Sequence, residues 1–338
     1  MNPCPRVGVD TQWRCNWTCS HCFYRRNPKL HTDGEVPTDQ IKDKVRKGKQ
    51  GGCDHVVFVG HGEPTLDKRL PALLDFCHGE GMATSIITNG ATNLGRIASM
   101  FGQGLDHLHI SSHGIGSTLT KITGCKDAFE KQTKLKDFLA EAGYPFRTNA
   151  AIQQANYEEL PLLARHEIAK GVHHFVLLGF LPHYEWSQHV DEVAVHPATL
   201  RPYIEEAADI LIEAGTLFTI RYHPMCHLRP DLWKYVVNAR YVFFDPWEWN
   251  YELQVRDLKA LWEAAVRCGK SVEVAGKPCS DCVLYRHCGG WNRVYAAAFG
   301  GAGLSAIQDI PEEYASVINL NGGLHDLNPA NHERGTIQ

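Results

Sequence analysis

Short apolar segments alternate with longer helix-like segments through the first two thirds of the chain. The apolar segments are rich in β-branched residues and end at glycine or polar turn residues, which predicts buried strands. The predicted strands cover residues 7–13, 55–60, 83–88, 107–111, 146–152, 173–180 and 217–222. The segments between them predict helices over residues 38–50, 67–80, 92–102, 127–143, 157–171 and 197–214.

This repeated alternation of strand and helix predicts a parallel sheet with right-handed crossover connections. No G-x-G-x-x-G sequence follows the first strand, so a dinucleotide-binding fold has little support. We therefore expect an α/β fold, a partial (β/α)6 TIM-like barrel. In such barrels the functional groups lie on the loops that follow the strands. Here those loops carry a cysteine-rich segment, then "GHGEP", "TNG" and "SSHG".

The alternation stops after residue 225, which predicts a domain boundary near residues 215–225. The expected organisation is a barrel over residues 1–220, a small metal-bearing domain over 221–300 and a tail over 301–338. The aromatic stretch 241–251 is expected in the core of the small domain, because aromatic side chains are more often buried in a hydrophobic core than placed in a substrate site. Lining a substrate chamber between the two domains is the alternative.

Composition narrows the class of protein. The chain has 338 residues and 43% hydrophobic residues, enough for a full core. A net charge of −4 predicts no nucleic-acid surface. The chain has no apolar signal segment at its start, and its longest apolar run, residues 175–181, is too short to span a bilayer. We expect a cytoplasmic protein without membrane partners, whose 12 cysteines serve metal ligation or thiol chemistry instead of disulfides.

The segment "CNWTCSHC" places Cys15, Cys19 and Cys22 on one short loop after the first strand. A structural zinc site normally uses four ligands, often as two C-x2-C pairs. Three thiolates instead suit a 4Fe-4S cluster with one iron open to a ligand from outside the protein. A zinc site completed by His21 or by a distant residue is the alternative.

These motifs together resemble the radical S-adenosylmethionine (radical SAM) family. "CNWTCSHC" matches the CxxxCxxC motif of that family, and "GHGEP" (60–64) is similar to its GGE-type loop, with His61 in place of the usual first glycine. "ITNG" (87–90) and "HISSHG" (109–114) resemble the ends of its third and fourth strands. "NYEELPLLARHEIAKGVHHF" (156–175) is similar to its fifth helix and sixth strand, so the resemblance covers about residues 7–222.

The resemblance implies a role for each matching position. Cys15, Cys19 and Cys22 would ligate the cluster, whose open iron would chelate the methionine part of S-adenosylmethionine (AdoMet). His21 would lie near the adenine, and Gly62 and Glu63 would receive the AdoMet ammonium group. The ribose and carboxylate contacts would come from Asn89, Ser111 and Asn149. Two alternatives stay open: Glu63 as a cap of the following helix, and Asn89 as a turn residue.

The family also implies the chemistry. One electron from the reduced cluster cleaves the sulfonium C–S bond of AdoMet, and the 5′-deoxyadenosyl radical then abstracts a hydrogen atom from the substrate. The electron would come from a flavodoxin- or ferredoxin-type donor. The protein positions the substrate and excludes water.

A second cysteine group, "CSDCVLYRHC", contains Cys279, Cys282 and Cys288. It resembles the SPASM/twitch auxiliary-cluster domains that follow many radical SAM barrels. No cysteine follows Cys288, which implies one auxiliary 4Fe-4S cluster. Cys226 is the expected fourth ligand, Cys268 is its rival, and structural zinc is the alternative metal. The remaining cysteines are expected to be ordinary thiols: Cys4, Cys53, Cys77 and Cys125.

We therefore expect a radical SAM enzyme that oxidises a small natural-product intermediate, such as a sugar, cyclitol or nucleoside, with help from the auxiliary cluster. The small-molecule expectation comes from the first predicted strand at residue 7, which leaves no room before it for a leader-peptide-binding domain. The first alternative is the same chemistry on a ribosomally made peptide, giving a cross-link or an epimer. The second is a non-catalytic iron–sulfur or zinc protein.

Overall fold

The structure of the chain is a computed structural model. It describes residues 6–22, 34–51, 53–60, 62–180, 190–237, 277–284, 288, 295, 298–299 and 303–315. Several features singled out in the sequence lie outside these residues: Cys4, His61, the aromatic stretch 241–251, and Cys268 with the helix expected around it.

Eight parallel strands form one sheet, and each strand pairs with its neighbour in the chain. The strands are β1 (Arg6–Val9), β2 (His55–Phe58), β3 (Ala83–Thr88), β4 (His107–Ser111), β5 (Phe146–Ile152), β6 (His174–Gly179), β7 (Leu217–Arg221) and β8 (Val236–Val237). Within the described ranges β1 and β8 are not paired, so the barrel is partial there. This confirms the predicted fold class.

β8 is the strand that the sequence pattern did not predict. It contains two residues, which is too short for any hydrophobic period to be recognised. It pairs with β7 at Ile220 and Arg221, so the sheet continues beyond residue 220, where the barrel was expected to end.

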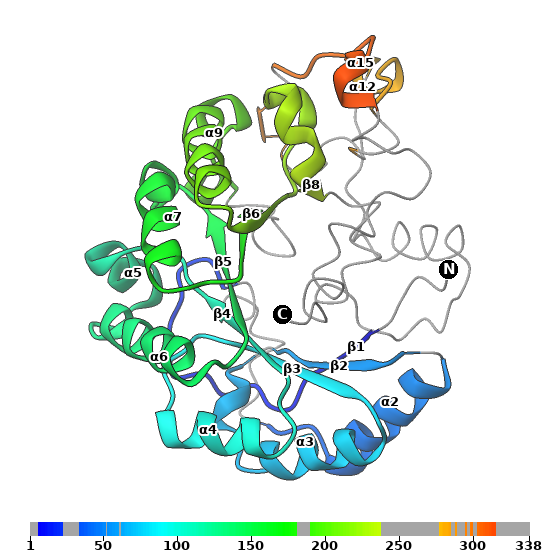
Figure 1. Ribbon diagram of the computed structural model, residues 1–338, viewed down its shortest axis with the longest axis vertical. Helices are drawn as coiled ribbons and strands as arrows, with labels where there is room; N and C mark the ends of the chain where they lie inside the picture. The colour runs from blue at the N-terminus through cyan, green and yellow to red at the C-terminus, as the bar shows by residue number, and fades with distance from the viewer. Residues whose placement is uncertain are drawn as a thin grey trace.

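Helices cover the outer face of the curved sheet, as Figure 1 shows. The helices of the barrel are α2 (Thr38–Gln50), α3 (Leu70–Gly79), α4 (Leu94–Gly102), α5 (Gly116–Thr123), α6 (Ala128–Ala142), α7 (Leu160–Ala169), α8 (Val190–Val193) and α9 (Pro197–Glu213). All six predicted helices are present, and the shorter α5 and α8 are additional. α6 ends at Gly143, whose φ of 70° is the left-handed conformation expected at that position.

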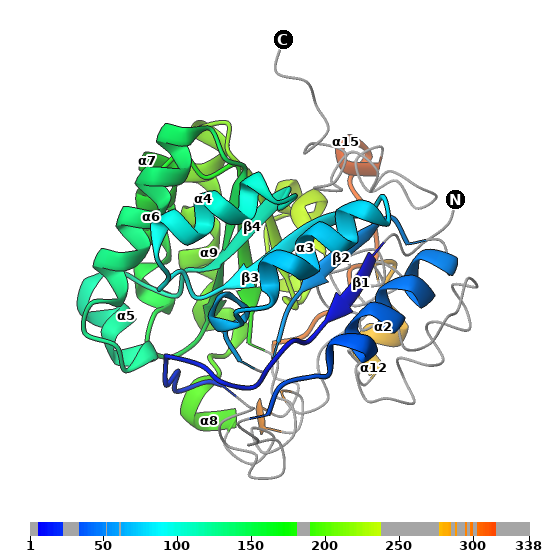
Figure 2. The same cartoon turned by 90° about the horizontal axis from the view of Figure 1, so that it is seen from below.

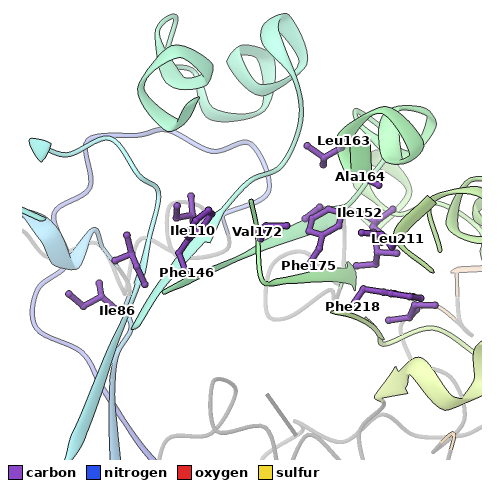
Figure 3. Packing of buried hydrophobic residues seen from close by; sticks show 14 of the residues in the cluster. Ile86, Ile110, Phe146, Ile152, Leu163, Ala164, Val172, Phe175, Leu211 and Phe218 are labelled. Atoms are coloured by element: carbon purple, nitrogen blue, oxygen red, sulfur yellow. The ribbon is translucent and has the colours of Figure 1, made fainter. Parts of the chain in front are cut away.

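The hydrophobic core lies between the sheet and these helices. Alternate strand residues such as Phe58, Ile86, Ile110 and Phe146 are fully buried and belong to one continuous apolar cluster. Figure 3 shows several of them with residues of the covering helices. At the sheet edge, seen from below in Figure 2, α2 lies beside β1. A Cβ atom on Gly48 would lie 2.9 Å from Val7, so glycine permits this close packing.

The opposite face of the strands, which lines the inside of the barrel, carries several polar and charged side chains. His109, Arg147 and His174 lie there side by side and are almost completely buried. Burial lowers the pKa of His109 well below its usual value, and the nearby charges of Arg147 and Arg221 lower it further. His109 is therefore neutral at pH 7.

No helix of the described chain is both long enough and apolar enough to cross a membrane.

Candidate functional site

The loop after β1 carries Cys15, Cys19 and Cys22 at the carboxyl end of the sheet. Two backbone hydrogen bonds fasten it to the end of α5: Thr18 N–H donates to Thr123 O (2.8 Å), and Ser20 N–H donates to Ile122 O (2.7 Å). The side chain of Trp17 is buried against α5 and α6. The cysteines therefore lie on a loop whose backbone is held from both sides of Cys19.

The loop after β2 lies directly against this cysteine loop. Glu63 N–H donates to Arg14 O at 2.8 Å, and Gln12 Nε2 donates to Glu63 O at 2.7 Å. A Cβ atom on Gly62 would lie only 2.6 Å from the carbonyl carbon of Trp13, and closer still to Arg14 O. Only glycine lets the two loops approach so closely. The predicted cofactor-binding residues Gly62 and Glu63 are thus held within a few ångströms of the residue that precedes Cys15.

The Glu63 carboxylate is buried and accepts hydrogen bonds from three residues of the protein. Oε1 accepts from Thr65 N (3.0 Å), Thr65 Oγ1 (2.6 Å) and Thr88 Oγ1 (2.7 Å), while Oε2 accepts from Asn89 N (2.8 Å). Burial raises the pKa of Glu63, and these hydrogen bonds oppose that rise. The side chain caps the short 3-10 helix η1 (Pro64–Leu66), as the capping alternative expected. Binding of the AdoMet ammonium group by Glu63 stays a prediction.

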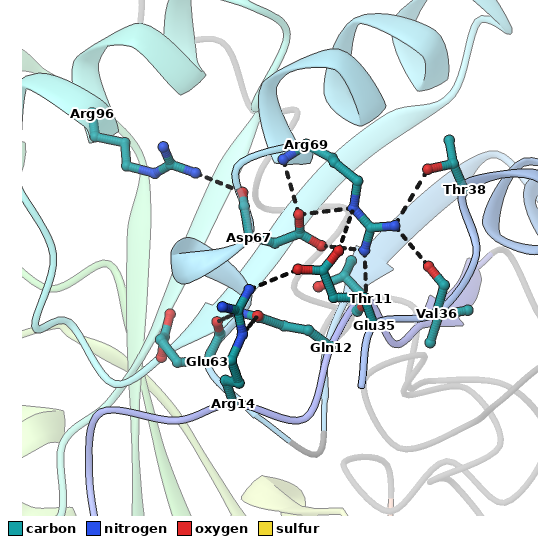
Figure 4. Close-up of polar contacts among 10 residues, drawn as sticks. All are labelled: Thr11, Gln12, Arg14, Glu35, Val36, Thr38, Glu63, Asp67, Arg69 and Arg96. Carbon is teal, nitrogen blue, oxygen red and sulfur yellow. Dashed lines mark hydrogen bonds and ion pairs between the residues drawn. The ribbon is translucent and has the colours of Figure 1, made fainter. Parts of the chain in front are cut away.

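A polar network behind the two loops fixes their positions (Figure 4). Arg69 pairs with Asp67 at 2.7 Å and donates to the carbonyl oxygens of Thr11 (3.0 Å) and Val36 (2.8 Å). Arg96 donates to the carbonyl oxygen of Asp67. Burial raises the pKa of Asp67, but hydrogen bonds and the positive charge of Arg69 outweigh that effect and hold the pKa below its usual value. The loop after β2 and the segment that follows β1 are therefore joined through partly buried arginine contacts.

Asn89 connects the third strand to the cysteine loop. Its Nδ2 donates to Asn16 Oδ1 at 2.8 Å and lies 3.8 Å from Cys15 Sγ. Its Oδ1 accepts from Ala91 N at 2.8 Å, and Gly90 has a φ of 79°. The turn that was the alternative for Asn89 is therefore present, and the same side chain also contacts the cysteine loop.

Ser111, the last residue of β4, pairs with Asn149 in the middle of β5. Asn149 is 9% exposed, and its Oδ1 is buried without a hydrogen-bond partner among the described residues. The structure thus places both residues at the same end of the barrel as the cysteine loop. Their contacts to ribose and carboxylate groups stay predictions.

His21 lies in a small cluster that the sequence analysis did not identify. Its ring meets that of His113 edge to face at 4.7 Å, and its Nδ1 lies 3.1 Å from Gln153 Nε2. His113 Nδ1 accepts from Ala151 N, so its proton is on Nε2. Burial lowers the pKa of His21 to about 4, so the ring is neutral at pH 7. His113 lies in the "SSHG" segment after the fourth predicted strand, and Gln153 follows the fifth. Their positions directly after predicted strands were the signal that could have placed both residues near the site.

The donor set on the cysteine loop fits an iron–sulfur cluster, because cysteine thiolates are the ligands that hold such clusters. No three histidine, cysteine, aspartate or glutamate side chains of the described ranges converge as the ligands of one metal ion do. The thiolates of a 4Fe-4S cluster bind different iron atoms and therefore need not converge on one point. The three thiolates of Cys15, Cys19 and Cys22, on a loop whose backbone is fastened to α5, could each bind a different iron atom in this way.

The four cysteines predicted to hold a second cluster line one pocket, whose empty volume of about 320 Å³ includes space open to solvent. The lining residues are Pro224, Met225, Cys226, Cys279, Cys282, Leu284, Cys288, Leu304 and Ser305. Cys226 lies in a 3-10 helix after β7, Cys279 in the short helix α12 (Lys277–Ser280). The fold therefore brings Cys226 to the three cysteines from which it is distant in the sequence. Their role as cluster ligands stays a prediction.

Known proteins give independent information on this chain. Residues 11–166 match the family described as "Radical SAM superfamily". Fe-coproporphyrin III synthase of Methanosarcina barkeri is 29% identical over 160 residues, which cover 47% of this chain and 40% of that protein. PqqA peptide cyclase of Methylobacterium nodulans is 26% identical over 190 residues, which cover 55% of this chain and 48% of that protein. The chain thus matches about half the length of these relatives.

Solved structures share the fold over nearly the whole chain. The structure described as "Native anSMEcpe with bound AdoMet" has a TM-score of 0.60 and 15% identity, covering 97% of this chain and 96% of that one. Radical SAM proteins use a 4Fe-4S cluster and AdoMet, and the cysteine loop lies within the matched residues. Residues 11–166 of this chain therefore form a domain of the radical SAM superfamily.

Proposed function

We propose that this chain reductively cleaves AdoMet and uses the resulting radical to abstract a hydrogen atom from an organic substrate. The observation that carries the proposal is the cysteine loop with Cys15, Cys19 and Cys22, fastened to α5 and lying against Gly62 and Glu63. When bound there, a reduced cluster supplies one electron, which splits AdoMet into methionine and a 5′-deoxyadenosyl radical.

The residues of the chain have defined tasks in this proposal. The three thiolates would hold the cluster, and the loop after β2 brings the backbone of Gly62 and Glu63 against the cysteine loop. The partly buried ring of His21 on the cysteine loop and the buried ring of His113 after β4 are both neutral and pack against each other. Such neutral rings suit an uncharged adenine and keep water away from a reactive radical.

We propose a small molecule as the substrate, such as a sugar, cyclitol or nucleoside, oxidised with a second 4Fe-4S cluster as the electron acceptor. The substrate would lose a hydrogen atom, one electron and a proton, and a second cluster held by Cys226, Cys279, Cys282 and Cys288 would accept the electron. The relative from Methanosarcina barkeri, named a synthase of Fe-coproporphyrin III, supports a small-molecule substrate. A flavodoxin- or ferredoxin-type protein would supply the first electron.

A peptide substrate is the second candidate, because another relative is named PqqA peptide cyclase. Incubation of the reduced protein with deuterated candidate substrates of both classes distinguishes them. Deuterium should appear in 5′-deoxyadenosine only with the true class. A non-catalytic metal protein would yield no 5′-deoxyadenosine at all.

The main test replaces Cys15, Cys19 and Cys22 together with alanine. The anaerobically reconstituted wild type should convert AdoMet to 5′-deoxyadenosine and methionine under strong reductant, and the triple variant should form neither product. The matched control replaces three other barrel cysteines, Cys53, Cys77 and Cys125, and should retain cleavage. Undiminished AdoMet cleavage in the variant that lacks Cys15, Cys19 and Cys22 would contradict the proposed function.

A further inference from the structure

Gln132 of α6 reaches the point where the pairing of β3 with β4 ends. The register of these two strands ends at the pair Thr88 and Ile110, and Asn89 and Ser111 are the next residues along the chain. Gln132 Nε2 donates to the carbonyl oxygen of Asn89 at 2.8 Å and to that of Ser111 at 2.8 Å. One side-chain amide thus joins the two strands just beyond their last paired residues.

The chemistry of these contacts fixes the orientation of the Gln132 amide. Both neighbours are carbonyl oxygens, which only accept hydrogen bonds, so the NH2 group faces them. Gln132 is 1% exposed, and its Oε1 is buried without a hydrogen-bond partner among the described residues. An apolar side chain at this position would avoid the unfavourable burial of that acceptor. The two donated hydrogen bonds, and not the filling of space, therefore distinguish glutamine here.

Gly90 leaves the space that the Gln132 side chain occupies. A Cβ atom on Gly90 would lie 3.2 Å from Gln132 Cγ and 3.3 Å from Ile110 Cγ2. The φ of Gly90 is 79°, a conformation that glycine adopts without strain. The turn after β3 is therefore shaped so that α6 can approach the carbonyl oxygen of Asn89.

Asn89 is held from three directions. Its backbone N–H donates to Glu63 Oε2 at 2.8 Å, its side chain donates to Asn16 Oδ1 at 2.8 Å, and its carbonyl oxygen accepts from Gln132. Gln132 is therefore connected through Asn89 to the loop after β2 and to the cysteine loop. Through Ser111 it is connected to the end of β4 as well.

We propose that Gln132 is a positioning residue for AdoMet, which holds Asn89 and Ser111 in the relative position that AdoMet binding requires. The inference rests on the proposed function and on the predicted contacts of Asn89 and Ser111 with AdoMet. Gln132 acts through the backbones of these two residues and needs no contact with AdoMet of its own. A side chain that fixes two binding residues in advance increases affinity, because less order has to be imposed when the ligand binds.

The test measures AdoMet binding to the reconstituted Gln132→Met protein by equilibrium dialysis. Methionine keeps the unbranched shape of glutamine but has no N–H donor. The dissociation constant should rise at least about tenfold, and the number of AdoMet sites per chain should stay unchanged. A purely structural role would instead reduce the number of sites and leave the affinity of the remaining sites unaltered, a result that would overturn the inference.

Gln132→Glu is a second variant, since an ionised carboxylate resembles the amide in shape but has no donor. It should also weaken AdoMet binding at least about tenfold. Hydrogen exchange of the protein without AdoMet gives a readout that does not depend on the ligand. In both variants residues 89–91 should exchange faster than in the wild type, because their turn has lost an anchor, while α3 should exchange as before. Wild-type exchange at residues 89–91 would overturn the inference.

Leu139→Ala is the matched control on the same helix. Leu139 is fully buried in the apolar cluster, about two turns beyond Gln132. Its truncation should lower the stability of the protein and leave the dissociation constant of AdoMet unchanged.

Three further outcomes are decisive. A loss of affinity in Leu139→Ala as large as that in Gln132→Met would overturn the inference and leave the proposed function intact. Failure of both Gln132 variants to fold, when Leu139→Ala folds, would make Gln132 a residue of stability alone and would also overturn it. A wild type that binds no AdoMet would instead refute the proposed function, and this inference with it.

Discussion

Gly62 is the residue at which the two loops of the candidate site touch. Replacing it with alanine forces a methyl group into the backbone of Trp13 and Arg14, so the loop after β2 must retreat from the cysteine loop. We expect Gly62→Ala to lower the free energy of unfolding by about 1–3 kcal/mol and to weaken AdoMet binding at least about tenfold, a factor worth about 1.4 kcal/mol. Equilibrium dialysis with AdoMet and urea denaturation measure the two effects.

Gly79 provides the control for Gly62. It is the last residue of α3, and nothing lies within 4 Å of the position that its Cβ would take. Gly79→Ala should leave AdoMet binding unchanged and stabilise the protein by up to about 1 kcal/mol. If both alanine variants bound AdoMet as the wild type does, the close approach at Gly62 would have no part in the site.

Single residues differ in how far the sequence alone reveals them. The spacing of Cys15, Cys19 and Cys22 is local, so the loop that joins them could be predicted from the sequence. Gln12, His113 and Gln153 could not be assigned, because their contacts depend on the register of strands that are distant in sequence. A sequence motif identifies residues that are close together along the chain, whereas the register of the strands determines which residues are neighbours across the sheet.

At the scale of elements, helices α6 and α7 are joined by a buried ion pair. Lys136 Nζ lies 2.5 Å from Glu167 Oε1, both side chains are at most 1% exposed, and Ser112 Oγ donates to the same oxygen at 2.7 Å. Lys136→Met leaves the Glu167 carboxylate buried without its cation. We expect the free energy of unfolding to fall by about 3–5 kcal/mol, measured by urea denaturation of the reconstituted protein.

Two further variants separate this effect from the loss of a surface charge. Lys136→Met combined with Glu167→Leu removes both charges and should cost much less than the single change. Lys134→Met on the same helix breaks an exposed pair with Glu130 and should change stability by less than about 1 kcal/mol. A single variant as stable as the double variant would mean that the ion pair does not stabilise the packing of α6 on α7.

The sequence predicted which helices exist more accurately than it predicted the residues at which they begin and end. The helix over residues 38–50 is found with the same bounds as α2. The helix expected over 157–171 begins instead as a 3-10 turn at Tyr157–Glu159, and α7 begins at Leu160, one residue before Pro161. Proline is favoured in the first turn of a helix, where its missing N–H costs nothing, and it therefore sets that start. α5 escaped prediction because its eight residues span little more than two turns.

At the scale of the whole molecule, Cys226 tests how the barrel joins the cysteines at 279–288. We expect Cys226→Ala to lower the iron content from about eight towards about four per chain and to change the spectrum of the second cluster. AdoMet cleavage at the first cluster should persist, and substrate turnover should fall more than cleavage does. Iron analysis and electron paramagnetic resonance measure this outcome.

Cys77→Ala is the control, because Cys77 is a fully buried thiol of α3 within the apolar cluster. It should leave iron content and spectra unchanged. Unchanged iron and spectra in Cys226→Ala as well would remove Cys226 from the ligand set, and Cys268→Ala would then show whether that residue takes its place. Sequence spacing could not choose between the two, because closing a longer loop adds little entropy cost.

The consecutive order of the strands has a consequence for the chain while it is being synthesised. Each strand after β1 pairs with the strand made just before it, and the contacts described around the cysteine loop involve residues 11–153. The pocket of the second cysteine group needs Leu304 and Ser305, near the end of the chain. Since folding follows the growing chain from its N-terminus, the first site can form on the ribosome before the last wall of the second pocket has been translated.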